Sequence, residues 1–370
     1  MGIKDINAVI KKADPTVFKD IPVEELKGKS FAVDISIFIN TFAMSSQEFW
    51  VNLLTNFLMN LVKYKLNPII IFDGLNVPIE KLDERENRKS SQQKNKVRED
   101  KLLHLKEKIL MTCFDGETTK LVPEEIQEDI KKSCRIGKDD LNLNDAEDVL
   151  LYVMNKLTKA EQAAAGITQN HKETARALVK AMGLRYIQAD GEAESLAASM
   201  AYHGIVDGVI SRDTDTMVYG CPLLITAIEK GIAKTVYLDD VLKALEMPMK
   251  QFRDLCICLG CDYNSRIPKQ GQVACLKNIK KYGSIEKWRE ADSSLPFHIL
   301  KWKRCREIFR PFSKEYIDRC SIRSKPTDEK ALDEIFTTVN SKYTGEYVLS
   351  CLNGKAIPMF LGKETSLLDD

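Results

Sequence analysis

Two runs of this sequence, Asp190-Gly-Glu-Ala-Glu-Ser-Leu-Ala197 and Asp213-Thr-Asp-Thr-Met-Val-Tyr-Gly220, decide the fold. Between them the residue pattern predicts a helix over 195–203 and a short buried strand over 206–210. Each run carries two acids separated by one residue, and at a helix start or a strand end such pairs can converge on one hard cation. Either pair alone has a plainer interpretation, as an acidic helix start that complements the helix dipole or as an aspartate-rich turn.

Two other apolar runs of strand length also end on an acid. They are Lys29-Ser-Phe-Ala-Val-Asp34 and Ile69-Ile-Ile-Phe-Asp73, with an amphipathic helix predicted between them over 49–65. Short, continuously apolar strands that alternate with helices predict an α/β fold whose sheet is mostly parallel and flanked by helices. Ligands of such sheets bind beyond the carboxyl ends of the strands. The sequence therefore predicts that acids from three strands meet at one edge of the sheet.

The rest of the chain gives a less uniform pattern. Helices are predicted over 3–12, 146–154, 169–182 and 252–259, and a further strand over 184–187. Residues 82–111 carry many charges and few apolar side chains, which is typical of an exposed helix or a mobile segment rather than of core. Residues 113–148 are acidic, lack a clear period and are interpreted as an insertion.

The composition predicts a globular intracellular protein. The 370 residues are 44% apolar and 29% charged, with a formal net charge of +1, which disfavours disorder. No apolar run approaches the length of a membrane span, and no signal-peptide pattern opens the chain. The ten cysteines show no even-spaced framework, so reduced thiols are expected. Cys256, Cys258 and Cys261 lack a fourth zinc ligand at a usual spacing, which favours core thiols, and the scattered histidines are given no catalytic role.

The charges are distributed unevenly along the chain. Basic residues outnumber acidic ones between Lys81 and Lys108, acidic residues dominate from Asp115 to Glu161, and the chain is strongly basic from Arg266 to Lys325. Acids flanked by basic segments suit a protein that holds a polyanion on positive surfaces while metal ions act on it. Each basic run alone is also typical of a solvated helix face.

At this point the sequence resembles a known family, the flap endonucleases and related structure-specific 5′ nucleases of the xeroderma-pigmentosum group G (XPG) type. The matching motifs follow the family's order and cover most of residues 1–350. They are Met1-Gly-Ile, Ala32-Val-Asp34, Ile71-Phe-Asp73-Gly, Glu192-Ala-Glu194, Asp213-Thr-Asp215 and Leu259-Gly-Cys-Asp262-Tyr.

The resemblance implies a PIN-like 5′ nuclease core, a helical arch and a helix-turn-helix region that binds duplex DNA. The expected division is into residues 1–80 and 171–265 for the two parts of the core, 81–170 for the arch, 255–330 for the basic helix-turn-helix region and 331–370 for a C-terminal helix and tail. The acidic part of the arch is longer than in a typical flap enzyme.

The resemblance also implies a metal site of seven acids that hold two Mg²⁺ or Mn²⁺ ions. Glu192 and Glu194 are expected between the two ions, with Asp34 and Asp73 toward one ion. The acids expected toward the other ion are Asp213, Asp215 and Asp262. Without metal, so many carboxylates would repel one another and raise each other's pKa, which predicts a weakly ordered apo site and acid-sensitive activity.

Cations near the acids are expected to act on the substrate. Lys81 and Arg88 match the family's lysine and arginine that contact the scissile phosphate, where preorganised positive charge stabilises the transition state. The alternative is that both are ordinary cations on a helix face. Arg85 and Gly2 are expected to contact DNA.

The duplex-binding turn departs from the family pattern. Ile267-Pro-Lys-Gln-Gly271 keeps only the second glycine of the family's Gly-x-Gly, because Lys269 replaces the first. Lys269, Gly271, Lys277, Lys280 and Lys281 are expected to contact duplex DNA, but Lys269 puts in question the K⁺ ion that relatives often bind there. Asn40 stands where flap enzymes usually carry a stacking aromatic, and Phe38 or Phe42 is either its substitute or a core residue.

The function predicted is metal-dependent hydrolysis of phosphodiester bonds at 5′ flaps and branched DNA, with 5′–3′ exonuclease activity, in DNA replication and repair. The alternatives are a bubble- or junction-cutting relative, a non-catalytic structure-selective DNA-binding protein and an RNA-cleaving enzyme with a related sheet. A monomer is expected in the nucleus or, if the divergent lineage is viral, at the site of viral DNA replication. Ser366-Leu-Leu-Asp-Asp370 resembles the opening of a sliding-clamp-binding peptide but lacks the paired aromatics, so no usual clamp binding is expected.

Overall fold

The structure is a computed structural model that describes residues 2–115, 118–134, 141–356 and 358. The described chain forms two compact units, and each is treated by itself. The first unit contains residues 1–42, 48–84 and 169–370, and the second contains residues 43–47 and 85–168. The five-segment division expected from the family resemblance stays a prediction.

The first unit is organised around a seven-stranded sheet with the order β1-β9-β8-β7-β2-β3-β6. The strands β2, β3, β6, β7 and β8 pair in parallel, while β9 and β1 are added antiparallel at one edge. The mostly parallel sheet is therefore confirmed. The strands are β1 (Phe18–Pro22), β2 (Ser30–Asp34), β3 (Asn67–Phe72), β6 (Arg185–Gln188), β7 (Gly208–Ile210), β8 (Leu223–Glu229) and β9 (Ile232–Tyr237).

The antiparallel edge was not predicted from the sequence. β8 and β9 form a hairpin whose two loop residues, Lys230 and Gly231, both have positive φ, at 50° and 81°. A two-residue turn of this kind matches the right-handed twist of the flanking strands. The Lys-Gly pair between two β-branched runs was the available signal.

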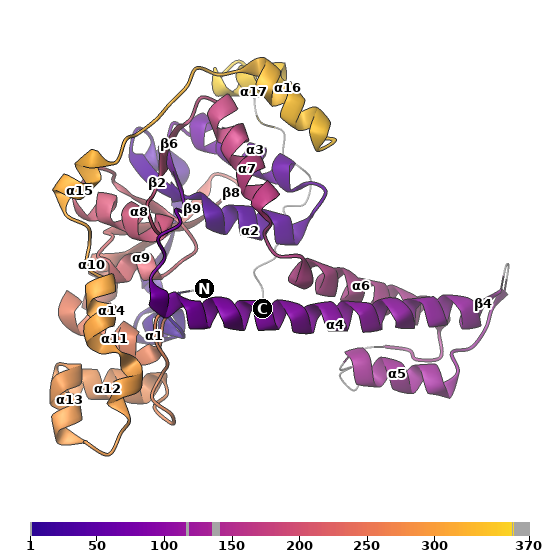
Figure 1. Ribbon diagram of the computed structural model, residues 1–370, viewed down its shortest axis with the longest axis horizontal. Coiled ribbons are helices and arrows are strands. Elements are labelled where there is room, and N and C mark those ends of the chain that lie inside the picture. The colour runs from indigo at the N-terminus through magenta and orange to yellow at the C-terminus, as the bar shows by residue number, and fades with distance from the viewer. Residues whose placement is uncertain (1, 116–117, 135–140, 357, 359–370) are drawn as a thin grey trace. The chain divides into compact units, whose positions relative to one another are not determined.

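Helices cover the sheet and continue its core into the C-terminal half. The helix α8 (Ala193–Tyr202) lies against β2 and β3, and α3 (Trp50–Lys63) and α7 (Gln169–Ala181) contact β3 and β6 (Figure 1). Ala32, Ile69 and Val209 belong to a buried cluster that includes α8 residues and extends to later helices. The other elements of this unit before residue 249 are α1 (Ile6–Ala13), η1 (Pro15–Val17), η2 (Val23–Leu26), α2 (Ile35–Ser45), whose last three residues belong to the second unit, η3 (Ile79–Lys81), α9 (Asp215–Val218) and α10 (Leu238–Ala244).

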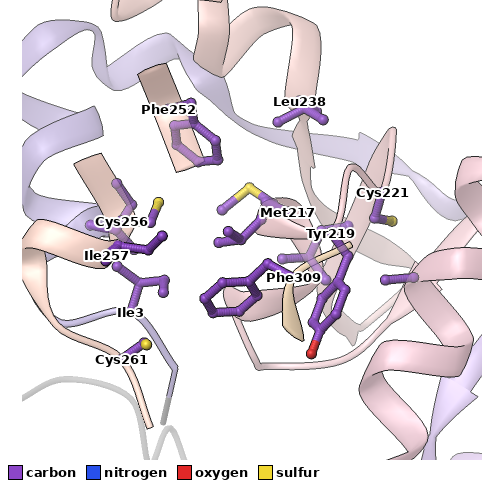
Figure 2. Close-up of a cluster of buried hydrophobic side chains, with 14 of the residues drawn as sticks. Ile3, Met217, Tyr219, Cys221, Leu238, Phe252, Cys256, Ile257, Cys261 and Phe309 are labelled. Atoms are coloured by element: carbon purple, nitrogen blue, oxygen red, sulfur yellow. The ribbon is translucent and has the colours of Figure 1, made fainter. Parts of the chain in front are cut away.

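The basic C-terminal helices share this core and do not form a separate body. Figure 2 shows Met217 of α9 in one cluster with Phe252 and Cys256 of α11, with Phe309 below them. Cys256, Cys258 and Cys261 are all buried in this apolar cluster, where the core-thiol interpretation had put them. The helices are α11 (Met249–Leu259), α12 (Gln272–Tyr282), α13 (Ile285–Ala291), η4 (Phe297–Leu300), α14 (Trp302–Ile308) and α15 (Lys314–Arg319).

The chain then returns to the free edge of the sheet. Arg323 pairs with Tyr186 of β6 through two backbone hydrogen bonds of 2.8 and 2.9 Å. The last two helices, α16 (Glu329–Thr338) and α17 (Gly345–Leu352), contact α7 and α3 respectively. Among the described residues, no helix is long and apolar enough to cross a membrane.

The second unit corrects one prediction. It contains α4 (Leu82–Cys113), which begins in the first unit, the short strands β4 (Phe114–Asp115) and β5 (Thr118–Thr119), α5 (Glu124–Cys134) and α6 (Ala146–Ala165). Leu102, Leu105 and Ile109 are buried in a separate apolar cluster, so the interpretation of 82–111 as exposed or mobile is wrong for its second half. The acidic insertion is the reason, because its helix α5 supplies Ile126 and Ile130 to this cluster.

Acids of the insertion also pair with α4. Lys108 contacts Glu125 at 2.7 Å and Asp129 at 3.0 Å. Two acids of the insertion, Glu125 and Asp129, are therefore paired with Lys108 within the second unit.

Candidate metal centre and active site

The predicted acids come from the ends of adjacent elements in the first unit. Asp34 ends β2, Asp73 follows β3 directly, and Asp213 follows β7 in the sequence. Because β7, β2 and β3 are neighbouring parallel strands, their carboxyl ends lie at the same edge of the sheet. Glu192 and Glu194 stand at the N-terminus of α8, Asp215 opens α9, and Asp262 follows α11.

Backbone and hydroxyl donors orient several of these carboxylates. The Ala193 N–H donates to Asp73 Oδ1 at 2.9 Å, and the Asp215 N–H donates to Asp213 Oδ1 at 3.0 Å. The Ser211 hydroxyl lies 3.5 Å from Asp34 Oδ2. The carboxylates are therefore held both by a local contact and by contacts between distant segments that meet at this edge of the sheet.

Three of the acids form the tightest cluster among the described residues. One carboxylate oxygen each from Glu194, Asp213 and Asp215 lies within 4.8 Å of the other two. Asp215 is fully buried, and neither of its side-chain oxygens has a hydrogen-bond partner in the described structure. A buried carboxylate with no donor is costly unless a cation is bound, and an all-oxygen donor set suits a hard divalent ion. The residues present therefore fit a Mg²⁺-like metal.

The electrostatics of the cluster agree with that fit. Burial, together with the charge of Asp213, raises the pKa values of Glu194 and Asp215 well above the usual range. Burial and the charges of Asp73 and Asp213 raise the pKa of Asp34 to about 8. A bound divalent cation would oppose both effects, because it favours the ionised form of each carboxylate.

Lys81 is the protein's own cation at this site. Its ammonium group donates a hydrogen bond to Glu192 and lies 3.3 Å from Asp262 Oδ2 and 3.6 Å from Glu194 Oε1. The side chain is only 11% exposed. Burial alone would lower the pKa of Lys81, but the surrounding carboxylates raise it well above its ordinary value, so the lysine is charged.

Tyr263 is a site residue to which the sequence interpretation gave no role. Its hydroxyl donates to Glu192 Oε2 at 2.5 Å and lies 3.4 Å from Glu194 Oε1. Burial raises the pKa of Tyr263 well above its usual range, so the hydroxyl remains a donor. The available signal was its position next to Asp262, where a phenol can reach the same carboxylates. Tyr263 therefore orients Glu192 and Glu194.

Gly2 lies against the acids as well. It has a φ of +89°, and a Cβ built on it would lie 2.2 Å from Asp213 Oδ1 and 2.9 Å from Asp215 Oδ1. The next residue, Ile3, donates its N–H to the Thr214 hydroxyl at 3.2 Å. Any side chain at position 2 would therefore displace the carboxylates. The expected contact of Gly2 with DNA stays a prediction.

Other expected site residues lie elsewhere. Arg85 and Arg88 lie on α4 within the second compact unit, so their expected contacts with DNA stay predictions. Phe38 is buried and stacks on Phe57 with ring centroids 4.4 Å apart, which agrees with its interpretation as a core residue. Phe42 also packs into this group, 6.0 Å from Phe57.

The turn that is expected to bind duplex DNA lies between α11 and α12. Lys269 has a φ of +62°, so a lysine adopts the left-handed conformation at the place where the family has glycine. Gly271 is the N-cap of α12, whose exposed lysines include Lys277 and Lys281. Lys280 forms an ion pair with Glu246 at 2.8 Å. The DNA contacts and the K⁺ site of this turn stay predictions.

Comparison with known proteins decides the family. The model of the XPG N-terminal domain matches residues 1–95, and the model of the XPG I-region matches residues 183–262, so the two together contain all seven acids. The chain belongs to the XPG family. It is accordingly a metal-dependent nuclease, in agreement with the buried acid cluster.

Curated relatives extend the match over nearly the whole chain. Flap endonuclease 1 of Vanderwaltozyma polyspora is 27% identical over 95% of this chain and 86% of its own length. Flap endonuclease 1 of Saccharomyces cerevisiae is 28% identical, with 95% and 85% covered. The enzyme of Talaromyces stipitatus reaches 32% identity, but over 61% of this chain and 59% of its own length.

Solved structures show the same fold. The catalytic core of Rad2 in complex with a DNA substrate has a TM-score of 0.58 at 17% identity, and covers 96% of this chain and 100% of that chain. Flap endonuclease-1 from Methanococcus jannaschii has a TM-score of 0.56 at 19% identity, with 91% and 94% covered. Human GEN1 in complex with Holliday junction DNA has a TM-score of 0.56 at 17% identity, with 95% and 77% covered. The XPG-type nuclease fold is confirmed.

Proposed function

We propose that this XPG-family nuclease is a 5′ flap endonuclease and 5′–3′ exonuclease that acts on branched DNA in replication and repair. The observation that carries the proposal is the buried cluster of Glu194, Asp213 and Asp215, in which the Asp215 oxygens have no hydrogen-bond donor and Glu194 lies 3.6 Å from the charged Lys81. The names of the fungal relatives, all flap endonucleases, support the substrate class. Because these relatives come from eukaryotes, we propose that the protein acts in the nucleus.

The metal we propose is a pair of Mg²⁺ ions, with Mn²⁺ as the substitute. Glu192 and Glu194 would lie between the ions, Asp34 and Asp73 would face one ion, and the other three acids would face the second. When bound, such ions activate a water molecule and stabilise the leaving 3′ oxygen.

The chain's own residues would orient the acids and neutralise the substrate. Tyr263 donates to one oxygen of Glu192, and the Ala193 N–H donates to one oxygen of Asp73, so both carboxylates have a donor that would orient them toward the ions. Lys81 already lies at the acids, and with Arg88 it would neutralise the negative charge that develops on the scissile phosphate.

The duplex beyond the cut would be held by the basic turn and α12. Lys269, Lys277 and Lys281 are exposed, so they can approach backbone phosphates, whereas Lys280 must first leave Glu246. Such contacts lose strength as salt rises, because each neutralised phosphate releases counterions. We propose a monomer, and the predicted lack of usual clamp binding concerns residues 366–370, which lie outside the described chain.

The test is the change Asp213→Ala, assayed on a 5′-flap substrate with Mg²⁺. We expect cleavage to be lost, because the change removes a central carboxylate, while DNA binding in Ca²⁺ largely survives. The matched control is Asp190→Asn, since Asp190 lies on the same stretch but bonds Tyr316 at 2.9 Å outside the cluster. Cleavage at the wild-type rate by the Asp213 variant would show that the active site is wrongly assigned.

A second candidate is a nuclease that prefers bubbles or four-way junctions. Two observations favour it: the second unit has its own apolar core, and the solved structures with the same fold include GEN1 with Holliday junction DNA. A panel of flap, bubble, gapped and four-way substrates, each with Mg²⁺ and with EDTA, separates the two candidates. Binding without cleavage of any substrate would favour the non-catalytic alternative, although all seven acids are present.

A further inference from the structure

We propose that Glu80 and Arg304 are positioning residues, whose ion pair fixes the turn that carries Lys81. Arg304 Nε donates to Glu80 Oε1 at 2.8 Å across 224 positions of sequence. Both residues belong to the first compact unit. The inference deepens the proposed function, because it rests on Lys81 acting at the metal centre.

The segment before Lys81 has few other anchors on its outer side. After Asp73 the chain runs through a loop into the single 3-10 turn η3. The first part of the loop is held by backbone bonds, with Asn76 N–H donating to Asp190 O at 2.9 Å. Val77 and Pro78 are half-buried, but Leu75 is 97% exposed and Ile79 is 72% exposed, so apolar packing holds this segment only in part. A polar contact from η3 would add a second anchor.

Glu80 provides that contact. Its side chain is only 14% exposed, although that of the preceding residue, Ile79, is open to solvent, and it contacts Arg304 of α14. The hydrogen bond from Arg304 lowers the pKa of Glu80, so the carboxylate is ionised at neutral pH. The adjacent residue, Lys81, reaches the acids instead. Glu80 thus connects η3 to α14, and Lys81 connects it to the acids of the metal centre.

The position of the Lys81 ammonium group depends on the ion pair between Glu80 and Arg304. A lysine side chain is long and flexible, so the place of its charge is decided by its backbone and by its partners. Its carboxylate partners are Glu192, Glu194 and Asp262, which are also expected metal ligands, and it lies 5.6 Å from the centroid of the Tyr263 ring. When ions and substrate compete for the carboxylate oxygens, the backbone of η3 and the Tyr263 ring are the constraints left on Lys81. A displacement of about 1 Å in such a group can slow catalysis about 100-fold.

A merely structural role predicts something different. The Arg304 side chain is 50% exposed, and ion pairs of this kind contribute little to global stability. Arg304 also contacts Glu307 of its own helix at 3.1 Å, which supplies a matched control on the same arginine. If the pair served stability alone, Glu80→Ala and Glu307→Ala would behave alike.

The first arm of the test needs no nuclease activity. Lys81 is acylated with an amine-reactive ester in EDTA, and its modification rate is followed by mass spectrometry of peptides. We expect slow modification in the wild-type protein and in Glu307→Ala, and modification faster by about one order of magnitude in Glu80→Ala, because a loosened η3 exposes the lysine. Equal rates in the two variants would overturn the proposal.

The second arm measures cleavage under single-turnover conditions with saturating enzyme. We expect Glu80→Ala to cut a 5′ flap about 10-fold more slowly while binding it with unchanged affinity in Ca²⁺, since the duplex-binding lysines are intact. The double change Glu80→Arg with Arg304→Glu should restore much of the rate and the protection of Lys81. If neither is restored although the protein remains folded, the pair does not position Lys81.

The two arms separate this inference from the proposed function. Faster acylation in Glu80→Ala, with no cleavage of any DNA by the wild-type protein, would refute the proposed function and keep the positioning contact. Normal flap cleavage by the wild-type protein, with Glu80→Ala and Glu307→Ala alike in both arms, would keep the function and refute the inference.

Discussion

At the scale of single residues, Lys81 joins the acids to the predicted action on the substrate. The family resemblance implies contact of this lysine with the scissile phosphate, and its ammonium group lies among the acids, 3.3 Å from Asp262. The Lys81 ammonium group and the expected metal ions would therefore compete for the carboxylates of Glu192 and Asp262.

The change Lys81→Met tests this competition. We expect the variant to bind Mn²⁺ more tightly without DNA, by about 1 kcal/mol, because an ion pair no longer has to be broken at Glu192. We also expect cleavage to fall about 100-fold or more, since a preorganised cation is lost from the transition state. Calorimetric titration of EDTA-stripped protein measures the first effect. Lys19→Met, which removes an exposed partner of Asp240, is the control, and weaker Mn²⁺ binding by the Lys81 variant would contradict the prediction.

At the scale of elements, the turn and helices that would hold duplex DNA are built around two polar features. The turn before α12 places Lys269 in the left-handed region, where a side chain is disfavoured. Deeper in this region Arg306 of α14 bonds both oxygens of Asp254 on α11, at 2.7 and 2.6 Å, and both oxygens of Glu286 on α13. The left-handed conformation of Lys269 lowers the stability of the fold but places a positive charge at the surface. The Arg306 hydrogen bonds connect α11, α13 and α14.

The change Lys269→Gly should make the protein more stable and its DNA complex weaker. Glycine adopts the left-handed conformation without steric strain, so the free energy of unfolding should rise by about 1 kcal/mol. Loss of one phosphate contact should reduce the number of counterions released on DNA binding by about one, and with it the salt dependence of the affinity. Urea unfolding and binding at two salt concentrations measure these effects. Lys230→Gly is the matched control, because Lys230 also has a positive φ, of 50°, but lies in the β8–β9 hairpin. A similar loss of DNA affinity in both variants would remove Lys269 from the interface.

The Arg306 contacts predict a specific response to acid. The Arg306 hydrogen bonds lower the pKa of Glu286 to about 2, below its usual 4.5, so the folded state binds fewer protons at this group than the unfolded state. Its stabilisation is therefore present above about pH 4.5 and is lost as the pH falls toward 2. We expect the free energy of unfolding of Glu286→Gln to depend less on pH in this window than that of the wild type. Urea titrations between pH 5 and 3 measure it, and parallel curves would contradict the assignment.

At the scale of the whole molecule, the metal centre draws on six elements of the first unit. The elements that contribute or adjoin the acids are β2, β3, β7, α8, α9 and α11, and all of them share the main apolar core. The helices and strands that hold the acids also form the main apolar core. Ion binding should therefore stabilise the entire first unit against unfolding. The second unit has its own apolar cluster and is expected to respond less.

Thermal unfolding with and without Mg²⁺ tests this coupling. We expect Mg²⁺ at about 100 times its dissociation constant to stabilise the wild type by about 2.7 kcal/mol. Asp215→Asn should unfold at a higher temperature than the wild type in EDTA, because a buried carboxylate without a donor is removed, and should respond much less to Mg²⁺. Asp190→Asn should respond like the wild type. An equal Mg²⁺ response in Asp215→Asn would place the ion elsewhere.

The sequence alone determined the positions of the acids in the fold. Continuous apolar runs that end at Asp34, Asp73 and just before Asp213 predict buried parallel strands, and the shared edge of such strands brings their terminal residues together. Local periodicity also predicted α3, α7 and α8 within a few residues of their bounds. These features depend on neighbours in the sequence and on strand geometry that is common to all α/β sheets.

Only the tertiary structure decided which side chains touch the acids and what covers the charged helix. Tyr263 on Glu192, Lys81 among the acids and Glu80 on Arg304 join residues that lie 71, 111 and 224 positions apart. The burial of Leu102 and Ile109 likewise required α5 to pack on α4. Periodicity carries no information about such distant pairs, because their contact depends on the path of the whole chain and on the reach of each side chain. The sequence thus named the carboxylates, and the tertiary structure decided which donors and cations hold them.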